Sequence, residues 1–198
     1  GGFVSEWTDY SGNNLHAIQT TNNNRPIQTN TIYNIHSAVR FDGTNDYLIT
    51  NFLESLVQPI TVFIVWKKNA TKPQTMFDGF TQDHRISFSY PYGNIELLSI
   101  FAGGVGNGLT YTKPLTNQLS VNSIILSSNS KVFDNGVLKG SASYVGSNYV
   151  DGFIIGAHYN LTRFFNGDIA EFIVYDTEIS TEQRVDVENY LIKKYAPA

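Results

Sequence analysis

The sequence predicts an all-β fold, a two-sheet antiparallel sandwich with one C-terminal α-helix. Three observations predict it. Only 15% of the 198 residues are charged, while asparagine, threonine, serine and glycine are abundant, which is typical of strands with uncharged polar faces and turns. Short apolar segments recur with turn residues between them. Helical spacing of apolar residues is convincing only from Ser180 to Tyr195, at the end of the chain.

The strand candidates follow in chain order. The segment 60–66 is apolar on both faces, so we expect a central strand that is covered on both sides. The segment 85–90 alternates and places Ile86, Phe88 and Tyr90 on one face. The segments 95–101 and 119–127 are further candidates, and 167–176 reads as a strand that runs directly into the helix.

The strongest turn signal is Asn135-Gly136, which lies between two apolar runs. A type I′ hairpin needs positive φ at both central residues, and Asn-Gly meets this need best. The helix signal is a capping box in which Ser180 caps the helix and Gln183 returns the hydrogen bond. Val187, Leu191 and Tyr195, with Tyr190 beside them, form the expected apolar stripe that packs on the sandwich.

Composition excludes several classes of protein. The net charge is −4 and no stripe of lysine and arginine is present, which argues against nucleic acid as a partner. No segment approaches the roughly 18 apolar residues of a membrane span. The absence of cysteine excludes disulfides, thiolate metal sites and cysteine catalysis. No repeat or linker divides residues 1–198, so we expect a single domain, and its Gly1-Gly2 start suggests one module of a larger, multi-domain protein.

Four motifs in order resemble the concanavalin A-like, laminin-G-like jelly rolls of bacterial and phage extracellular proteins. The motifs are the opening Trp7-Thr8-Asp9-Tyr10-Ser11-Gly12-Asn13, the Phe41-Asp42-Gly43 strand, the Phe133-Asp134-Asn135-Gly136-Val137 hairpin and the closing Gly167-Asp168-Ile169-Ala170-Glu171 strand with its helix. The resemblance implies a jelly roll, located outside the cell, on its surface or on a virion. It also implies a module that binds glycans or proteins, with calcium bound in an edge loop of some members.

Catalysis finds little support in the residues. Paired carboxylates of a glycoside hydrolase must lie a few Å apart, but Asp168 and Glu171 are three residues apart and would face opposite sides of a regular strand. The four histidines match no zinc or nucleophile motif. We therefore expect no enzyme activity.

Calcium is the one cofactor that the sequence suggests. Asp42, Asn45 and Asp46 offer hard oxygen ligands in one turn. The alternative is an Asx turn, in which the same side chains bond their own backbone.

Two loops offer the aromatic rings, amides and guanidinium groups that bind sugars. The candidate ligand-binding residues are His84, Arg85, Tyr92 and Asn94 in the first loop and Tyr159, Asn160 and Arg163 in the second. Both loops adjoin confident strands, so we expect them at the rims of the sandwich. Trp7 and Trp66 are expected in the core.

The function that these observations favour is a non-catalytic, lectin-like carbohydrate-binding module for adhesion or substrate targeting. An alternative is a structural or protein-interaction module of a virion or cell-surface assembly, and a polysaccharide-acting enzyme is the third. The partner would accordingly be a glycan or a protein of a cell surface or virion.

Overall fold

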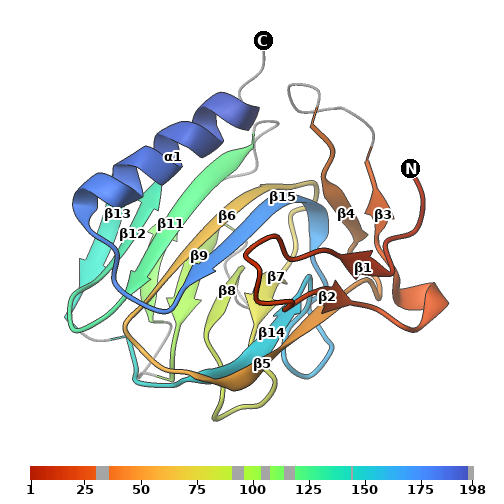
Figure 1. The fold of residues 1–198 in the computed structure, drawn as a ribbon, viewed down its shortest axis with the longest axis horizontal. Coiled ribbons are helices and arrows are strands. Elements are labelled where there is room, and N and C mark those ends of the chain that lie inside the picture. Colours follow the sequence, from red (N-terminus) through yellow and green to blue (C-terminus); the bar gives the residue numbers. More distant parts are fainter. Residues whose placement is uncertain (30–35, 91–95, 104–107, 114–118, 144, 196–198) are drawn as a thin grey trace.

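The computed structural model describes residues 1–29, 36–90, 96–103, 108–113, 119–143 and 145–195. Two antiparallel sheets form a sandwich, and a single helix lies against the outer side of one sheet (Figure 1). The predicted all-β sandwich with one C-terminal helix is therefore confirmed.

Within the described residues, the strands of each sheet have a defined spatial order. One sheet consists of β1 (Glu6–Trp7), β2 (Ala17–Ile18), β5 (Leu48–Leu56), β14 (Val150–Ile155), β7 (Gln74–Asp78), β8 (Ser87–Tyr90), β9 (Leu97–Phe101) and β10 (Leu109–Thr112). The other consists of β13 (Val137–Ala142), β12 (Ser130–Asp134), β11 (Ser120–Leu126), β6 (Ile60–Lys68), β15 (Asn166–Tyr175), β4 (Val39–Asp42) and β3 (Ile27–Gln28). The helices are a 3₁₀ turn, η1 (Asn22–Asn24), and α1 (Thr181–Tyr195).

The apolar segment 60–66 forms the central strand that the sequence predicts. β6 pairs with β11 on one side and with β15 on the other, and every residue from Ile60 to Trp66 is buried. The predicted strands 95–101 and 119–127 correspond to β9 and β11, with Ile95 outside the described residues. In β8 the expected inner residues are buried, but Ser87 and Ser89 on the opposite face are buried too.

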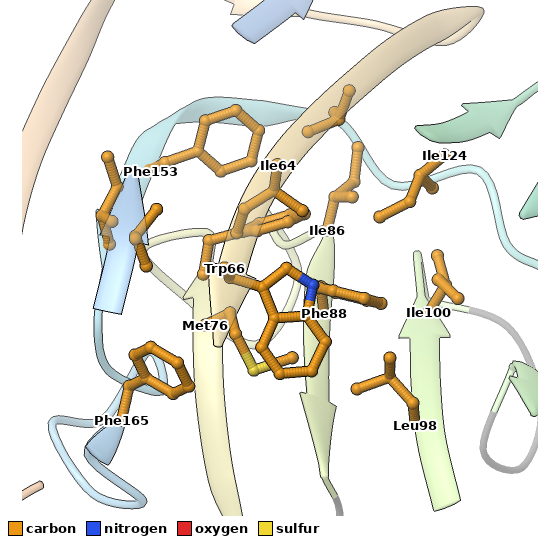
Figure 2. Close-up of a cluster of buried hydrophobic side chains, with 14 of the residues drawn as sticks. Ile64, Trp66, Met76, Ile86, Phe88, Leu98, Ile100, Ile124, Phe153 and Phe165 are labelled. Carbon is orange, nitrogen blue, oxygen red and sulfur yellow. The ribbon is translucent and has the colours of Figure 1, made fainter. Parts of the chain in front are cut away.

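Trp66 lies at the centre of the core between the sheets. Figure 2 shows its indole ring among Met76, Phe88 and Phe165. The ring centroids of Trp66 and Phe88 are 5.8 Å apart with the planes at 89°, the edge-to-face geometry that aromatic pairs favour. The indole Nε1–H donates to Asn122 Oδ1 at 2.7 Å, so its polar atom is satisfied inside the core. The prediction that Trp66 is a core residue is confirmed.

The Asn135-Gly136 turn joins β12 to β13 as predicted. Asp134 pairs with Val137, which leaves a two-residue loop. Asn135 has φ of 50° and Gly136 has φ of 78°, the left-handed values that a type I′ turn requires.

Helix α1 begins with the predicted capping box. Ser180 N–H donates to Gln183 Oε1 at 2.9 Å, and Gln183 N–H donates to Ser180 Oγ at 3.1 Å. Leu191 and Tyr195 pack on the sheet, but Tyr190 is exposed, so its assignment to the apolar stripe was wrong. Two further residues of the buried face, Arg184 and Glu188, are charged and form an ion pair under the helix.

A β-bulge in β15 changes which side chains share a face. The register with β6 shifts between Ile169 and Glu171, which adds one residue to this strand. Ile169 and Phe172 therefore both point into the core between the sheets, and Asp168 and Glu171 lie on the same outer face rather than on opposite ones. Asp168 pairs with Arg40 at 2.6 Å and Glu171 with Lys194 at 2.9 Å, so both carboxylates have structural partners.

Within the described part of the chain, α1 is too short and too polar to cross a lipid bilayer.

Candidate functional site

The structure brings the two predicted sugar-binding loops together. One loop joins β7 to β8 and carries His84 and Arg85; the other follows β14 and carries Tyr159, Asn160 and Arg163. They meet because β14 and β7 are neighbours in one sheet. Tyr92 and Asn94 of the first predicted loop lie outside the described residues.

Asp78, at the end of β7, joins the two loops. Arg85 Nε donates to Asp78 Oδ1 at 2.9 Å and Arg85 Nη2 to Oδ2 at 2.7 Å, a bidentate pair. The backbone N–H groups of Gly79 and Tyr159 donate to the same carboxylate at 2.9 and 3.2 Å. Burial raises the pKa of Asp78 to about 6, although Arg85 and these N–H groups act in the opposite direction. Asp78 is thus a buried anchor that orients both loops.

Tyr159 is engaged by its neighbours in this cluster. The Arg85 guanidinium lies 4.7 Å from the centroid of its ring, and the His158 ring lies 4.4 Å away on a tilted plane. Its hydroxyl donates to Gln82 Oε1 at 2.5 Å. Most polar atoms here therefore bind one another, which favours a structural role over a ligand-binding one.

The loop after β14 is nevertheless strained. Leu161 and Arg163 have φ of 52° and 47°, and such left-handed values cost a residue other than glycine on the order of 1 kcal/mol. Strain of this kind concentrates at functional loops. The predicted ligand role of Tyr159, Asn160 and Arg163 stays a prediction.

His84 lies apart from the Asp78 carboxylate, in a chain of surface hydrogen bonds. Its Nδ1 is 2.8 Å from Asp151 Oδ2, and its Nε2 is 2.5 Å from the Tyr149 hydroxyl. Ser55 Oγ donates to Asp151 Oδ1 at 2.6 Å. A catalytic triad would need the serine on the histidine rather than on the aspartate, so this chain of bonds is not one.

The predicted calcium turn is built as an Asx turn. Asp42 Oδ1 accepts the N–H groups of Thr44 and Asn45 at 2.7 and 3.3 Å. Asp46 Oδ2 accepts the Asp42 N–H at 2.9 Å, and burial raises the pKa of Asp46. Gly43 has φ of 77° and lies against Asn166, with no room for a Cβ, so the turn requires glycine. In the parts of the chain that can be described, no three histidine or acidic side chains gather as metal ligands. Calcium binding stays a prediction.

The Asp42–Asp46 turn also forms one wall of a recess that was not predicted from the sequence. We call it the asparagine recess: it has a volume of about 590 Å³ and is lined by Phe3, Asn22, Asn23, Arg25, Ile27, Arg40, Phe41, Asp42, Asp46, Asn69 and Asn166. The available signal was the run Asn22-Asn23-Asn24-Arg25, which places amides and a guanidinium group in one loop.

Hydrogen bonds hold the walls of the asparagine recess in place. Asn45 Nδ2 donates to Asn23 O at 2.6 Å and to Asn24 Oδ1 at 3.1 Å, which ties η1 to the Asp42–Asp46 turn. Asn166 Nδ2 donates to Asp42 O at 2.6 Å. Arg25 Nε donates to Gln19 O at 2.9 Å, so its guanidinium is positioned before any ligand arrives.

The side-chain amides of Asn22, Asn23 and Asn69 remain available. Within the described residues these three amides form no hydrogen bond, although the backbone carbonyl groups of Asn22 and Asn23 do. Each amide offers two donors and one acceptor oxygen. The ring of Phe3 is 73% exposed at the edge of the recess. The recess combines a concave shape, hydrogen-bond donors and acceptors, and an aromatic ring. Such an arrangement can bind a small polar ligand without catalysing a reaction.

Comparisons with known proteins show the fold. No model of a protein family matches the chain, and no curated protein sequence matches it. The receptor-binding domain of botulinum neurotoxin D is 17% identical, with a TM-score of 0.69 over 93% of this chain and 50% of that one. A ligand-binding domain of botulinum neurotoxin serotype D in complex with N-acetylneuraminic acid is 14% identical, with a TM-score of 0.65 over 96% and 51% of the two chains.

A SAP-like pentraxin from Limulus polyphemus is also similar, with 17% identity and a TM-score of 0.58 over 76% of this chain and 81% of that one. At such identities the likeness shows the fold alone, a jelly-roll β-sandwich. The chain spans about half the length of the toxin domains that it matches.

Proposed function

We propose that this chain is a non-catalytic carbohydrate-binding module and that the asparagine recess is its binding site. The observation that carries the proposal is the set of three available amides, Asn22, Asn23 and Asn69, in one concave site. A sugar hydroxyl both donates and accepts hydrogen bonds. An asparagine amide can bond it in either direction, because the amide has N–H donors and an acceptor oxygen. The exposed ring of Phe3 provides an apolar face for the C–H groups of a pyranose.

The neighbours in fold support this proposal. One of the similar toxin domains is described as a complex with N-acetylneuraminic acid, and others as receptor-binding domains. A module of this kind would work in adhesion or substrate targeting outside a cell, on its surface or on a virion. A shallow single site binds weakly, and several copies on a larger assembly would supply the avidity.

Asp78, the carboxylate with the most strongly raised pKa, is not placed to hydrolyse a glycan bound in the asparagine recess. A glycoside hydrolase needs a proton donor that reaches the substrate. The carboxylate whose pKa is raised most clearly is Asp78, but both of its oxygens accept hydrogen bonds from Arg85 and from backbone N–H groups. It is also fully buried, so no substrate can reach it.

The test is a glycan array, sialylated glycans included, probed with the full chain in calcium and again in chelator. Asn22→Ala and Asn69→Ala should each weaken binding about tenfold, because each removes donors and an acceptor that contact the ligand. Asn129→Ala is the matched control, since Asn129 is also exposed, lies in the turn between β11 and β12, and does not line the recess.

Other outcomes would move or remove the site. Loss of binding only in Tyr159→Ala or Asn160→Ala would move it to the loops predicted from the sequence. Loss in chelator, together with loss in Asp42→Asn, would establish a calcium site in the Asp42–Asp46 turn. An array that stays blank in both buffers would contradict carbohydrate binding.

A further inference from the structure

A second and larger hollow lies where the two sheets separate. We call it the edge groove: it has a volume of about 1510 Å³ and is lined by the second halves of β5 and β15 and by the segment that joins β1 to β2. Sites for small ligands occupy about 300–1,000 Å³. The edge groove therefore suits a larger occupant.

Exposed apolar side chains concentrate at the edge groove. Among the described residues, the four most exposed large hydrophobic side chains are Phe3 at 73%, Tyr10 at 93%, Leu53 at 94% and Val57 at 61%. All four line the edge groove. Single exposed hydrophobic residues are ordinary, but a cluster beside a groove marks an interaction surface.

The edge groove also contains an unpaired strand edge. β15 pairs with β6 as far as Tyr175, but its pairing with β4 on the other side ends at Ile169. Over Glu171–Tyr175 no described strand covers that second edge. The segment pairs regularly with β6, and Phe172 and Val174 point alternately into the core. A regular strand with unpaired N–H and C=O groups is a template for another strand.

The facing edge of β5 is a poorer template. Its register with β14 jumps between Asn51 and Leu56, with only one residue of β14 between the paired positions. Such bulges disrupt strand pairing. An incoming strand is therefore expected on β15.

The charge of the edge groove is strongly negative. Five carboxylates line it, on Glu6, Asp9, Glu54, Glu171 and Asp176, against one ammonium group, on Lys194. These six groups have a net charge of −4, which equals the formal net charge of the whole chain. The positive and negative charges on the rest of the chain are therefore equal in number. In the described structure Lys194 is paired with Glu171, while Glu6, Glu54 and Asp176 form no ion pair.

We propose that the edge groove binds an extended, positively charged peptide segment of a partner protein, which adds a strand to β15 along Glu171–Tyr175. Main-chain hydrogen bonds to β15 provide the affinity, as in other cases of strand addition. Alternate apolar side chains of the peptide contact Tyr10 and Leu53. Its lysine or arginine side chains reach Glu54 and Asp176. This inference does not rest on carbohydrate binding in the asparagine recess, although Phe3 lines both hollows.

The test uses the full chain and a fluorescent peptide that alternates lysine and valine, with binding measured by fluorescence anisotropy. Glu54→Lys and Asp176→Lys should each weaken binding at least about tenfold, and more at low salt than at high salt. Tyr10→Ser combined with Leu53→Ser should weaken it as well, and these side chains are too exposed for the change to unfold the protein. Matched controls are Glu182→Lys, and Val137→Ser with Leu138→Ser, which are exposed on α1 and β13.

Two altered peptides separate strand addition from simple charge attraction. Replacing lysine by glutamate in the peptide should abolish binding. Methylating alternate backbone nitrogens keeps the charge but removes hydrogen-bond donors, and it should also abolish binding. Equal binding of the methylated peptide, or equal weakening by Glu182→Lys, would overturn the proposal.

Self-association is the remaining outcome of the test. Sedimentation that shows a dimer of the chain, lost in Leu53→Ser, would make a second copy the occupant and overturn the peptide proposal. Asn22→Ala should bind the peptide normally, so a failure of either proposal can be told from a failure of the other.

Discussion

His158 shows at the residue scale how burial determines a protonation state. Burial lowers its pKa to about 4, with Arg163 and Arg85 acting in the same direction and the hydrogen bond to Asn160 against it. Its Nδ1 is 2.6 Å from Asn160 Oδ1, an acceptor, so the ring proton of the neutral form lies on Nδ1. The other nitrogen, Nε2, lies 3.7 Å from Asp78 Oδ2, too far for a hydrogen bond.

This depressed pKa makes the stability of the fold depend on pH. His158 takes up its proton near pH 6.5 in the unfolded chain but only near pH 4 in the folded one. Its contribution to stability is therefore fully present above pH 6.5 and is lost as the pH falls toward 4. The loss of stability caused by His158→Gln should accordingly be about 2 kcal/mol smaller at pH 4.5 than at pH 7, as measured by urea unfolding.

Thr162→Ala serves as the control for this prediction. Thr162 Oγ donates to the same Asn160 Oδ1 at 2.5 Å but does not titrate. The loss of stability caused by Thr162→Ala should therefore be the same at pH 4.5 and at pH 7. A cost of His158→Gln that is equally independent of pH would show that the ring already titrates normally in the folded protein.

Single residues also set the limit of what the sequence could predict about the site. Asn135-Gly136 and Ser180 act through neighbours in the chain, so their roles could be predicted. Asn22 and Asn69 come together only because η1 and the end of β6 meet across the fold. Such a contact depends on long-range packing and leaves no local pattern. The two predicted loops do lie side by side, because one follows β7 and the other follows β14, and these two strands are paired in the sheet.

At the scale of the element, substitutions of two adjacent residues of α1 can show which side of the helix faces the sheet. Leu191 is 0% exposed and Tyr190 is 56% exposed, although they are adjacent in the sequence. Leu191→Ala should cost about 2–5 kcal/mol of unfolding free energy, since it leaves a cavity under the helix. Tyr190→Ala, the neighbouring change, should cost less than about 0.5 kcal/mol. Equal costs in chemical unfolding would contradict the helix orientation.

Most elements were predictable because their patterns are local. The strands β6, β8, β11 and β15 each have an apolar spacing that the sequence shows directly. The bulge near Ala170 was not predictable, since it depends on pairing with β6 rather than on the spacing within β15. One added residue reverses the faces of all residues beyond it, which is why Asp168 and Glu171 were assigned to opposite sides.

At the scale of the whole molecule, α1 acts as a third layer on the sandwich. It covers an apolar surface on the outer side of the seven-stranded sheet, made by Ala38, Phe63, Val65, Val121, Ala170 and Ile179. Leu191 and Tyr195 of the helix belong to the same cluster. Ser123 on β11 donates to Glu188, and the Tyr195 hydroxyl donates to Ala170 O at 3.1 Å. The outer face of this sheet is therefore apolar and buried under the helix, whereas many antiparallel sheets expose one face to solvent.

A chain that ends at Ile179 tests this dependence. The core between the sheets stays intact, but Phe63, Val65 and Val121 lose their cover and the hydroxyl of Ser123 loses its partner. Contiguous exposed apolar surface of this kind promotes association. We expect the shortened chain to bind a hydrophobic dye and to sediment as a larger species, whereas the full chain does neither. A monomer that unfolds cooperatively with the stability of the full chain would show that the sandwich needs only two layers.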